Sequence, residues 1–217
     1  MATLDVQRLL DRAQALDGRP LPGVRMTEAQ FDAWCGEDVR AEWVDGEVIV
    51  MSPANSRHNR LNLWLLGLLQ AFVEHHDAGE IFGIEMQLRL SSRRSSRRNP
   101  DAVFVARARA NLVEETYIDG APDLVMEIVS PDSESRDWRD KYIEYEAAGV
   151  REYWVIDPAS QRLEAYTLTR ARKYRRLDES QGRLPSKVLR GFYLRPEWLW
   201  QSPLPKLATV LKELGVR

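Results

Sequence analysis

Residues 124–129, LVMEIV, constrain the fold more than any other segment, because a single carboxylate, Glu127, interrupts an otherwise apolar run. A near-continuous apolar run of this length is typical of a strand covered on both faces. Alternation along a strand places Glu127 on the same side as Val125 and Val129. A carboxylate there loses its hydration, and a buried charge without a partner is costly. The sequence therefore predicts that Glu127 has a partner, which is a metal ion, a basic side chain or a proton.

Two interpretations of Glu127 remain open from this argument. The residue forms a buried salt bridge of structural value, or it belongs to a functional site, where carboxylates with shifted pKa values gather. Asp101 opens another apolar strand, PDAVFVA, and strand ends often carry ligands at the mouth of a sheet. A simple turn residue after Pro100 is the alternative interpretation of Asp101.

Lys141 lies in the helix expected over residues 136–148, directly after the Glu127 strand. Asp137 precedes it by four residues, so a helical ion pair explains both residues without any function. In the functional interpretation, Lys141 reaches back towards Glu127, because the connection SPDSESR is short.

Two further polar residues stand earlier in the chain. Glu42 comes just before the turn dipeptide Asp45-Gly46 and is either a third carboxylate of a metal site or a surface charge. His58 stands at the start of an apolar helix, where a single histidine is more often structural.

The periodicity of apolar residues predicts a mixed α/β domain with a central sheet. Thr27 and Gln30 have the spacing of a capping box at the start of a short helix. The middle of the chain then follows the order helix, strand, strand, strand, helix, strand. The expected segments are 57–76, 84–90, 100–106, 124–130, 136–148 and 152–157. Hairpins around residues 41–51 and 162–177 add strands to the edges, and residues 91–99 form a polar basic loop.

Two carboxylates and a lysine suit the hydrolysis of phosphodiester bonds. Carboxylate oxygens hold Mg²⁺ or Mn²⁺, which polarise a phosphate and lower the pKa of a bound water. A lysine orients that water and offsets negative charge on the phosphate oxygens. The three histidines lack the spacing of a zinc site, and no glycine-rich phosphate loop occurs.

The motifs resemble a known family. The stretches EWVDGEVIVMSP, His58, NPDAVFV and APDLVMEIVSPDSESRDWRDKYIEYEAAGVREYWVIDP are similar to those of the Uma-two group of restriction endonuclease-type proteins, in the PD-(D/E)XK nuclease superfamily. The resemblance runs from about residue 27 to residue 199. It implies a restriction endonuclease-like αβββαβ core, with a mixed central sheet flanked by helices and extra edge hairpins.

The resemblance also implies roles for individual residues. Asp101 and Glu127 would hold Mg²⁺ or Mn²⁺, and Glu42 matches a recurrent glutamate before the turn. The superfamily normally places its lysine two residues after the second acid, where this chain has Val129. Lys141 would replace it from the following helix. Supporting positions would be His58 and Asp137. The activity implied is that of a Mg-dependent endodeoxyribonuclease.

DNA is the expected partner, although the net charge is only −2, so the basic residues that bind it must be local. The candidates precede Asp101 and would contact phosphates: Arg93, Arg94, Arg97 and Arg98. A mobile, solvated loop is the alternative interpretation of this cluster. A second basic cluster, within residues 170–176, is interpreted as charge that blocks edge-strand pairing.

The 217 residues divide into an N-terminal helical extension (1–24), a nuclease-like domain (25–200) and a C-terminal helical tail (201–217). The N-terminus lacks a signal-peptide apolar stretch, no apolar region is long enough to span a bilayer, and Cys35 is the only cysteine. We therefore expect a cytoplasmic protein without membrane contact, and a homodimer by symmetry.

A catalytically silent module that binds DNA or a protein is the alternative function. A carboxylate-pair glycosidase is the weakest candidate, because no aromatic-rich cleft pattern accompanies the acids.

Overall fold

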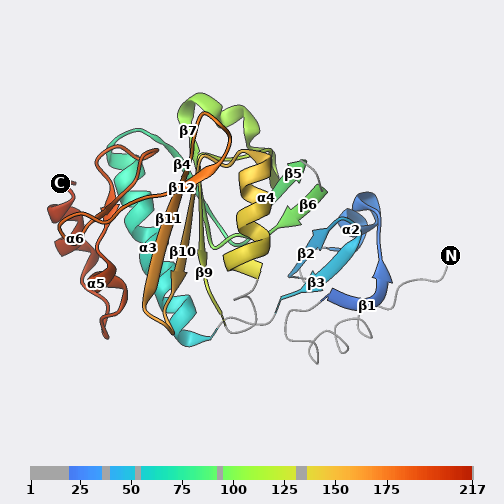
Figure 1. Cartoon of the computed structure of the whole chain (residues 1–217), viewed down its shortest axis with the longest axis horizontal. Coiled ribbons are helices and arrows are strands. Elements are labelled where there is room, and N and C mark those ends of the chain that lie inside the picture. The colour runs from blue at the N-terminus through green and yellow to red at the C-terminus, as the bar shows by residue number, and fades with distance from the viewer. Residues whose placement is uncertain (1–19, 36–39, 52–54, 92–94, 131–135, 217) are drawn as a thin grey trace.

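The computed structural model describes residues 20–35, 40–51, 55–91, 95–130 and 136–216, without the side chains of residues 20–23 and 136. Most strands of this part form two mixed sheets (Figure 1). The first sheet has the order β1 (Pro20–Arg25), β3 (Glu47–Val50), β2 (Ala41–Val44), β6 (Ser95–Arg98), β5 (Gln87–Ser91) and β8 (Tyr117–Asp119). The second, here called the central sheet, has the order β12 (Tyr174–Arg176), β11 (Arg162–Leu168), β10 (Glu152–Asp157), β9 (Leu124–Ile128), β7 (Ala102–Ala106) and β4 (Gly79–Gly83).

The helices lie on both faces of the central sheet. Helix α3 (Ser56–His75) and helix α4 (Lys141–Ala148) flank it from opposite sides in Figure 1. The other elements are α2 (Glu28–Trp34), a 3-10 turn (Arg107–Leu112), a π-helical turn (Arg136–Asp140), α5 (Pro196–Leu199), α6 (Leu207–Glu213) and a small pair, β13 (Leu184–Pro185) and β14 (Tyr193–Leu194). The prediction of a mixed α/β fold with helices around a central sheet is confirmed.

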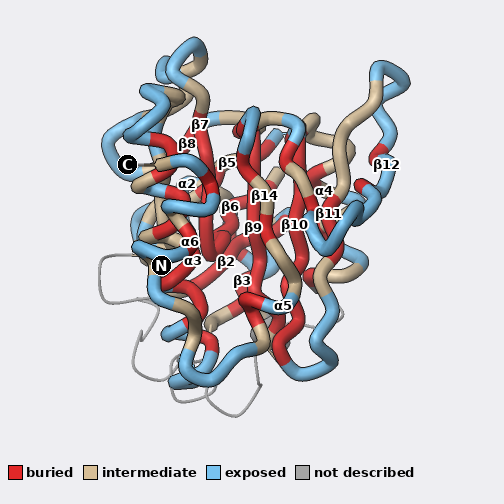
Figure 2. Tube along the Cα trace, turned by 90° about the vertical axis from the view of Figure 1, so that its left-hand side faces the viewer, coloured by how far each residue is buried: buried red, intermediate tan, exposed pale blue. Residues whose placement is uncertain are grey.

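Strand β9 is buried along its whole length, as Figure 2 also shows. Its side chains alternate between two apolar clusters. Leu124, Met126 and Ile128 pack with the residues of α3, whereas Val125 and Val129 pack with Tyr145 of α4. Glu127 therefore lies on the α4 side, as expected from the alternation. The strand pairs in parallel with β10 through the α4 crossover and antiparallel with β7.

Three local predictions are confirmed by the backbone. Thr27 and Gln30 form a reciprocal capping box at the start of α2. Asp45 and Gly46 connect β2 to β3 with φ values of 49° and 95°, as a tight hairpin turn requires. Gly149 ends α4 with φ of 97°, a conformation that glycine adopts without steric strain.

The predicted basic loop over residues 91–99 is partly wrong. Residues 95–98 form strand β6 between β2 and β5, although serine and arginine have little intrinsic preference for strands. Pairing on both sides and burial of the two arginines against acidic side chains outweigh this preference. Residues 92–94, which include the predicted DNA contacts Arg93 and Arg94, lie outside the described residues.

The first strand of the αβββαβ core also differs from the prediction. The expected strand at 84–90 overlaps β5, which belongs to the first sheet, while β4 provides the core strand beside β7. The order of element types is right, but its first strand comes from residues 79–83. The segment GEIFG has only three residues with side chains between two glycines, which is too few for apolar alternation to predict a strand.

The first and the last segments of the described part both pack on the rest of the fold. Residues 20–24, assigned to the N-terminal helical extension, lie in β1 and pair with β3, which corrects that assignment. Residues 1–19 lie outside the described part. Helix α6 packs on α3, and Val210 and Leu214 belong to the same apolar cluster as α3. No helix of the described residues is long and apolar enough to cross a membrane.

Candidate active site

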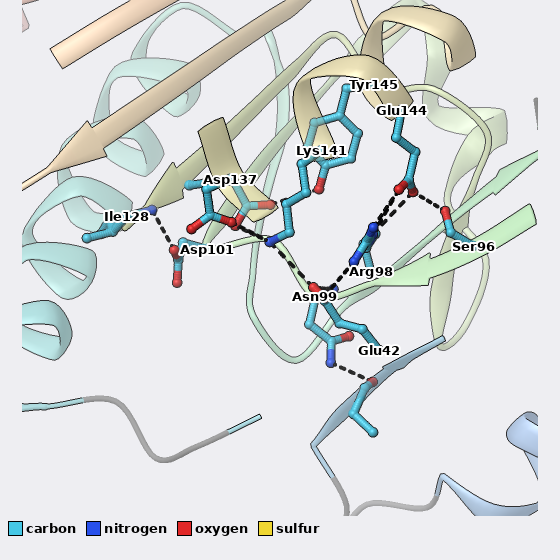
Figure 3. A network of polar contacts seen from close by, with 12 residues as sticks. Glu42, Ser96, Arg98, Asn99, Asp101, Ile128, Asp137, Lys141, Glu144 and Tyr145 are labelled. Carbon is cyan, nitrogen blue, oxygen red and sulfur yellow. Dashed lines mark hydrogen bonds and ion pairs between the residues drawn. The ribbon is translucent and has the colours of Figure 1, made fainter. Parts of the chain in front are cut away.

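Lys141, the first residue of α4, lies at the centre of a buried polar cluster (Figure 3). Its Nζ atom is 2.9 Å from Glu127 Oε2, 3.1 Å from Asp137 Oδ1 and 3.4 Å from Glu42 Oε1. The alternation of β9 points Glu127 at α4, and the turn before α4 brings Asp137 to the same ammonium group. Lys141 therefore makes both contacts expected from the sequence, since it pairs with Asp137 and also reaches Glu127.

Arg98 is the second cation of this cluster. Its Nη1 donates to Glu42 Oε2 at 2.8 Å, and its Nη2 lies 2.6 Å from Glu144 Oε2. Glu42 is therefore held between Arg98 on β6 and Lys141 on α4, and it also accepts a hydrogen bond from the backbone of Asn99. Glu42 is fully buried, so the surface-charge interpretation of this residue is wrong.

Asp101 and His58 form a second group beside the end of β9. Asp101 Oδ2 accepts a 2.7 Å hydrogen bond from the backbone N–H of Ile128, the residue after Glu127. His58 Nε2 lies 3.3 Å from Asp101 Oδ1 and 3.1 Å from the carbonyl oxygen of Ile128. Both side chains are buried. Asp101 is thus fixed against the same strand that carries Glu127.

The electrostatics of the site follow from burial and from crowding of like charges. The pKa of Glu127 is raised to about 8, chiefly because the side chain is buried. Lys141 lowers this pKa, whereas Asp137, Asp101 and Glu42 contribute to the rise. Burial alone would lower the pKa of Lys141, but the surrounding carboxylates raise it well above its usual value. Lys141 therefore stays charged, and Glu127 is the group that responds to pH.

The pKa of His58 is also raised. Burial acts to lower it, but the hydrogen bond and negative charge of Asp101 outweigh burial. The positive form of His58 is favoured by the carboxylate of Asp101, which the sequence predicted as a metal ligand.

The donor chemistry of the site fits a hard divalent cation. Four carboxylates contact Lys141 or Arg98, and a fifth, Asp101, lies beside them. The four are Glu42, Glu127, Asp137 and Glu144. Oxygen ligands are those that Mg²⁺ prefers, and it is commonly held by one or two carboxylates plus water and substrate phosphate. Within the described residues, no group of three or more His, Cys, Asp or Glu is arranged to hold a metal ion. A metal ion here would therefore be held by fewer than three of these side chains, with water and substrate phosphate as its other ligands.

The structure thus brings Glu42, Glu127, Asp137 and Lys141 into one contact network and places Asp101 with His58 beside it. Arg97 and Arg98 do not lie on a phosphate-binding loop. Both are buried, with Arg97 paired to Glu28 and Asp32, so their guanidinium groups are not presented to a nucleic acid.

Sequence reasoning missed Tyr145 and the structural role of Arg98. The Tyr145 hydroxyl donates a 2.7 Å hydrogen bond to Glu127 Oε1, so Lys141 and Tyr145 between them contact both oxygens of this carboxylate. The available signal was the four-residue spacing of Asp137, Lys141 and Tyr145, which places all three on one helical face.

We expect the stability of the metal-free protein to fall between about pH 4.5 and about pH 8. The pKa of Glu127 is higher in the folded protein than in the unfolded chain, so its contribution is fully present below the unfolded value and is lost as pH rises through about 8. His58 acts in the same direction. The Tm measured in EDTA should therefore decline less steeply with pH in Glu127→Gln than in the wild type. Parallel Tm curves for the two proteins would contradict the assignment to Glu127.

Comparisons with known proteins identify the family and the fold of this chain. No curated protein matches the sequence. The fold is similar to that of a crystal structure of "a putative nuclease belonging to DUF820" from Anabaena variabilis, with a TM-score of 0.67 and 19% sequence identity. The match covers 81% of this chain and 97% of that one. A family model named Uma2, described as "Putative restriction endonuclease", matches residues 28–197, which includes every candidate residue of the cluster. The chain therefore belongs to the Uma2 family and has a nuclease-like fold.

Proposed function

We propose that this protein is a metal-dependent endonuclease that hydrolyses phosphodiester bonds of DNA. The observation that carries the proposal is the contact of 2.9 Å between Lys141 and Glu127, inside a buried cluster that also contains Glu42 and Asp137. Buried ionisable groups with shifted pKa values gather at functional sites. Membership of the Uma2 family supports the choice of a nuclease over other metal-dependent hydrolases.

The proposed roles follow from the contacts. Asp101 and Glu127 would hold Mg²⁺ or Mn²⁺. Glu42, expected from the sequence as a third ligand, would instead position Lys141 and Arg98 through its contacts with both. Such an ion polarises a phosphate and lowers the pKa of a bound water. Lys141 orients the attacking water and offsets negative charge that develops on the phosphate oxygens. Tyr145 positions Glu127 by its hydrogen bond, and Asp137 positions Lys141.

His58 has a positioning role in this proposal. It contacts Asp101 Oδ1 and the Ile128 carbonyl, so it fixes Asp101 relative to the strand that carries Glu127. His58 and Asp137 therefore act through other residues rather than on the substrate.

A silent module that binds DNA or a protein is the second candidate function. One observation favours it: Lys141 and Tyr145 already contact both oxygens of Glu127. Metal binding in the nuclease would require these contacts to loosen, whereas a module without catalysis would keep them.

A plasmid-nicking assay with Mg²⁺ and with Mn²⁺ tests the proposal. We expect nicking by the wild type and a loss on the order of 100-fold or more in Asp101→Asn, because one carboxylate ligand becomes a neutral amide. Asp178→Asn, at an exposed position, is the matched control and should nick normally. Nicking by all three proteins at one rate, or by none of them, would remove the enzymatic proposal and leave the silent module.

The proposal also covers the oligomeric state of the protein and its location in the cell. One active site per chain cuts one strand at a time, so a homodimer would supply both cuts in a duplex. A cytoplasmic location agrees with the single cysteine, Cys35. Sedimentation of the purified protein tests the dimer.

A further inference from the structure

A groove of about 720 Å³ lies between the first turns of α3 and the segment that follows α5. The residues that matter to its chemistry are Arg57, Arg60, Trp64, Leu199, Trp200 and Leu204. They combine two guanidinium groups with an aromatic and aliphatic wall. None of its lining residues is acidic.

Arg57 and Arg60 are suited to hold an anion. Both are exposed at the mouth of the groove, and neither forms an ion pair within the part of the chain that the structure describes. Many other arginines of the described part are neutralised by acids, including Arg97, Arg98 and Arg109. The positive charge at this groove is therefore available to phosphate groups.

The wall of the groove offers flat apolar surface. Trp200 is half-buried and lines the groove beside Leu199. Trp64 is buried, and its Nε1 donates a 2.8 Å hydrogen bond to the carbonyl oxygen of Pro205, which ties the segment after α5 to α3. Aromatic walls combined with arginines bind unpaired bases by stacking, whereas the bases of a duplex are already stacked on one another.

The groove and the candidate active site share the first turn of α3. His58 lies between Arg57 and Arg60 in the sequence, and its side chain contacts Asp101 and the carbonyl oxygen of Ile128, the last residue of β9. The two arginines of the groove therefore lie within one helical turn of the residue that contacts Asp101.

We propose that this groove binds an unpaired segment of a nucleic acid strand next to the bond that is cut. The inference rests on the proposed nuclease function and deepens it, since it assigns single-stranded or frayed nucleic acid to the site in preference to intact duplex. Arg57 and Arg60 bind backbone phosphates, and Trp200 stacks on a base.

Fluorescence anisotropy with labelled oligothymidylate tests this proposal in EDTA, where no cleavage is required. Arg57→Glu/Arg60→Glu should weaken binding at least about 10-fold and flatten the dependence on salt, because two phosphate contacts are lost. Trp200→Leu should weaken it by about 5-fold or more through lost stacking. Arg175→Glu is the matched control: Arg175 is exposed on β12, has no ion pair among the described residues and should bind as the wild type does.

Equal affinity of the wild type and both groove variants for oligothymidylate would overturn the proposal. Thermal unfolding curves show whether all three proteins are folded in this comparison. Tighter binding of a duplex of equal length than of oligothymidylate would also overturn it. Failure of the proposed nuclease function gives a different result. If the wild type binds oligothymidylate through the groove but does not nick plasmid, the groove proposal stands and the catalytic proposal is wrong.

Discussion

Replacing Lys141 with methionine is expected to lower the free energy of unfolding by about 3–5 kcal/mol, because it removes one partner of a buried charge network. Methionine keeps most of the length of the side chain and removes the ammonium group. Glu42, Glu127 and Asp137 would then face one another without the central cation. Urea unfolding in EDTA at neutral pH measures the change.

Two variants separate this effect from simple loss of packing. Adding Asp137→Asn to Lys141→Met removes one of the carboxylates that would otherwise lose its cation, and should recover part of the lost stability. Lys173→Met is the surface control, because Lys173 is exposed and pairs only with Glu146, so the change should be within about 1 kcal/mol. If Lys141→Met and Lys173→Met had equal effects, Lys141 would not be the cation that holds the cluster together.

Glu127→Gln is expected to reduce plasmid nicking by a factor on the order of 10³ or more, since it removes a charged group at the reaction centre. Glutamine keeps the shape of the side chain and can still accept from Tyr145 or Lys141. Folding should therefore persist, and above pH 8 the variant should be at least as stable as the wild type without metal. Nicking rates with Mg²⁺ and Tm values in EDTA give the two measurements.

A loss of activity with retained stability is the specific signature of this prediction. Glu80→Gln, at an exposed position on β4, is the matched control and should leave both quantities unchanged. A Glu127→Gln protein that nicks at the wild-type rate would show that the buried carboxylate has a structural role only.

The local structure around the site was predictable from short segments. The apolar run of residues 124–129 identified a strand covered on both faces, and its two-residue period placed Glu127 with Val125 and Val129. Thr27, the Asp45-Gly46 pair and Gly149 marked ends and turns through backbone requirements that depend only on neighbouring residues.

The sequence by itself therefore determined the buried strand, the helix after it and a carboxylate that needs a partner. Only the tertiary structure decided which partners the charges have. Arg98 and Glu42 are 56 residues apart in the sequence. Lys141 contacts both Glu127 and Glu42 because α4 packs on the face of β9 that carries Glu127 and also approaches the first sheet, which carries Glu42. The same packing turned Arg97 and Arg98 from candidate DNA contacts into buried ion pairs. Strand register and helix placement bring distant residues together, and periodicity within one segment carries no information about them.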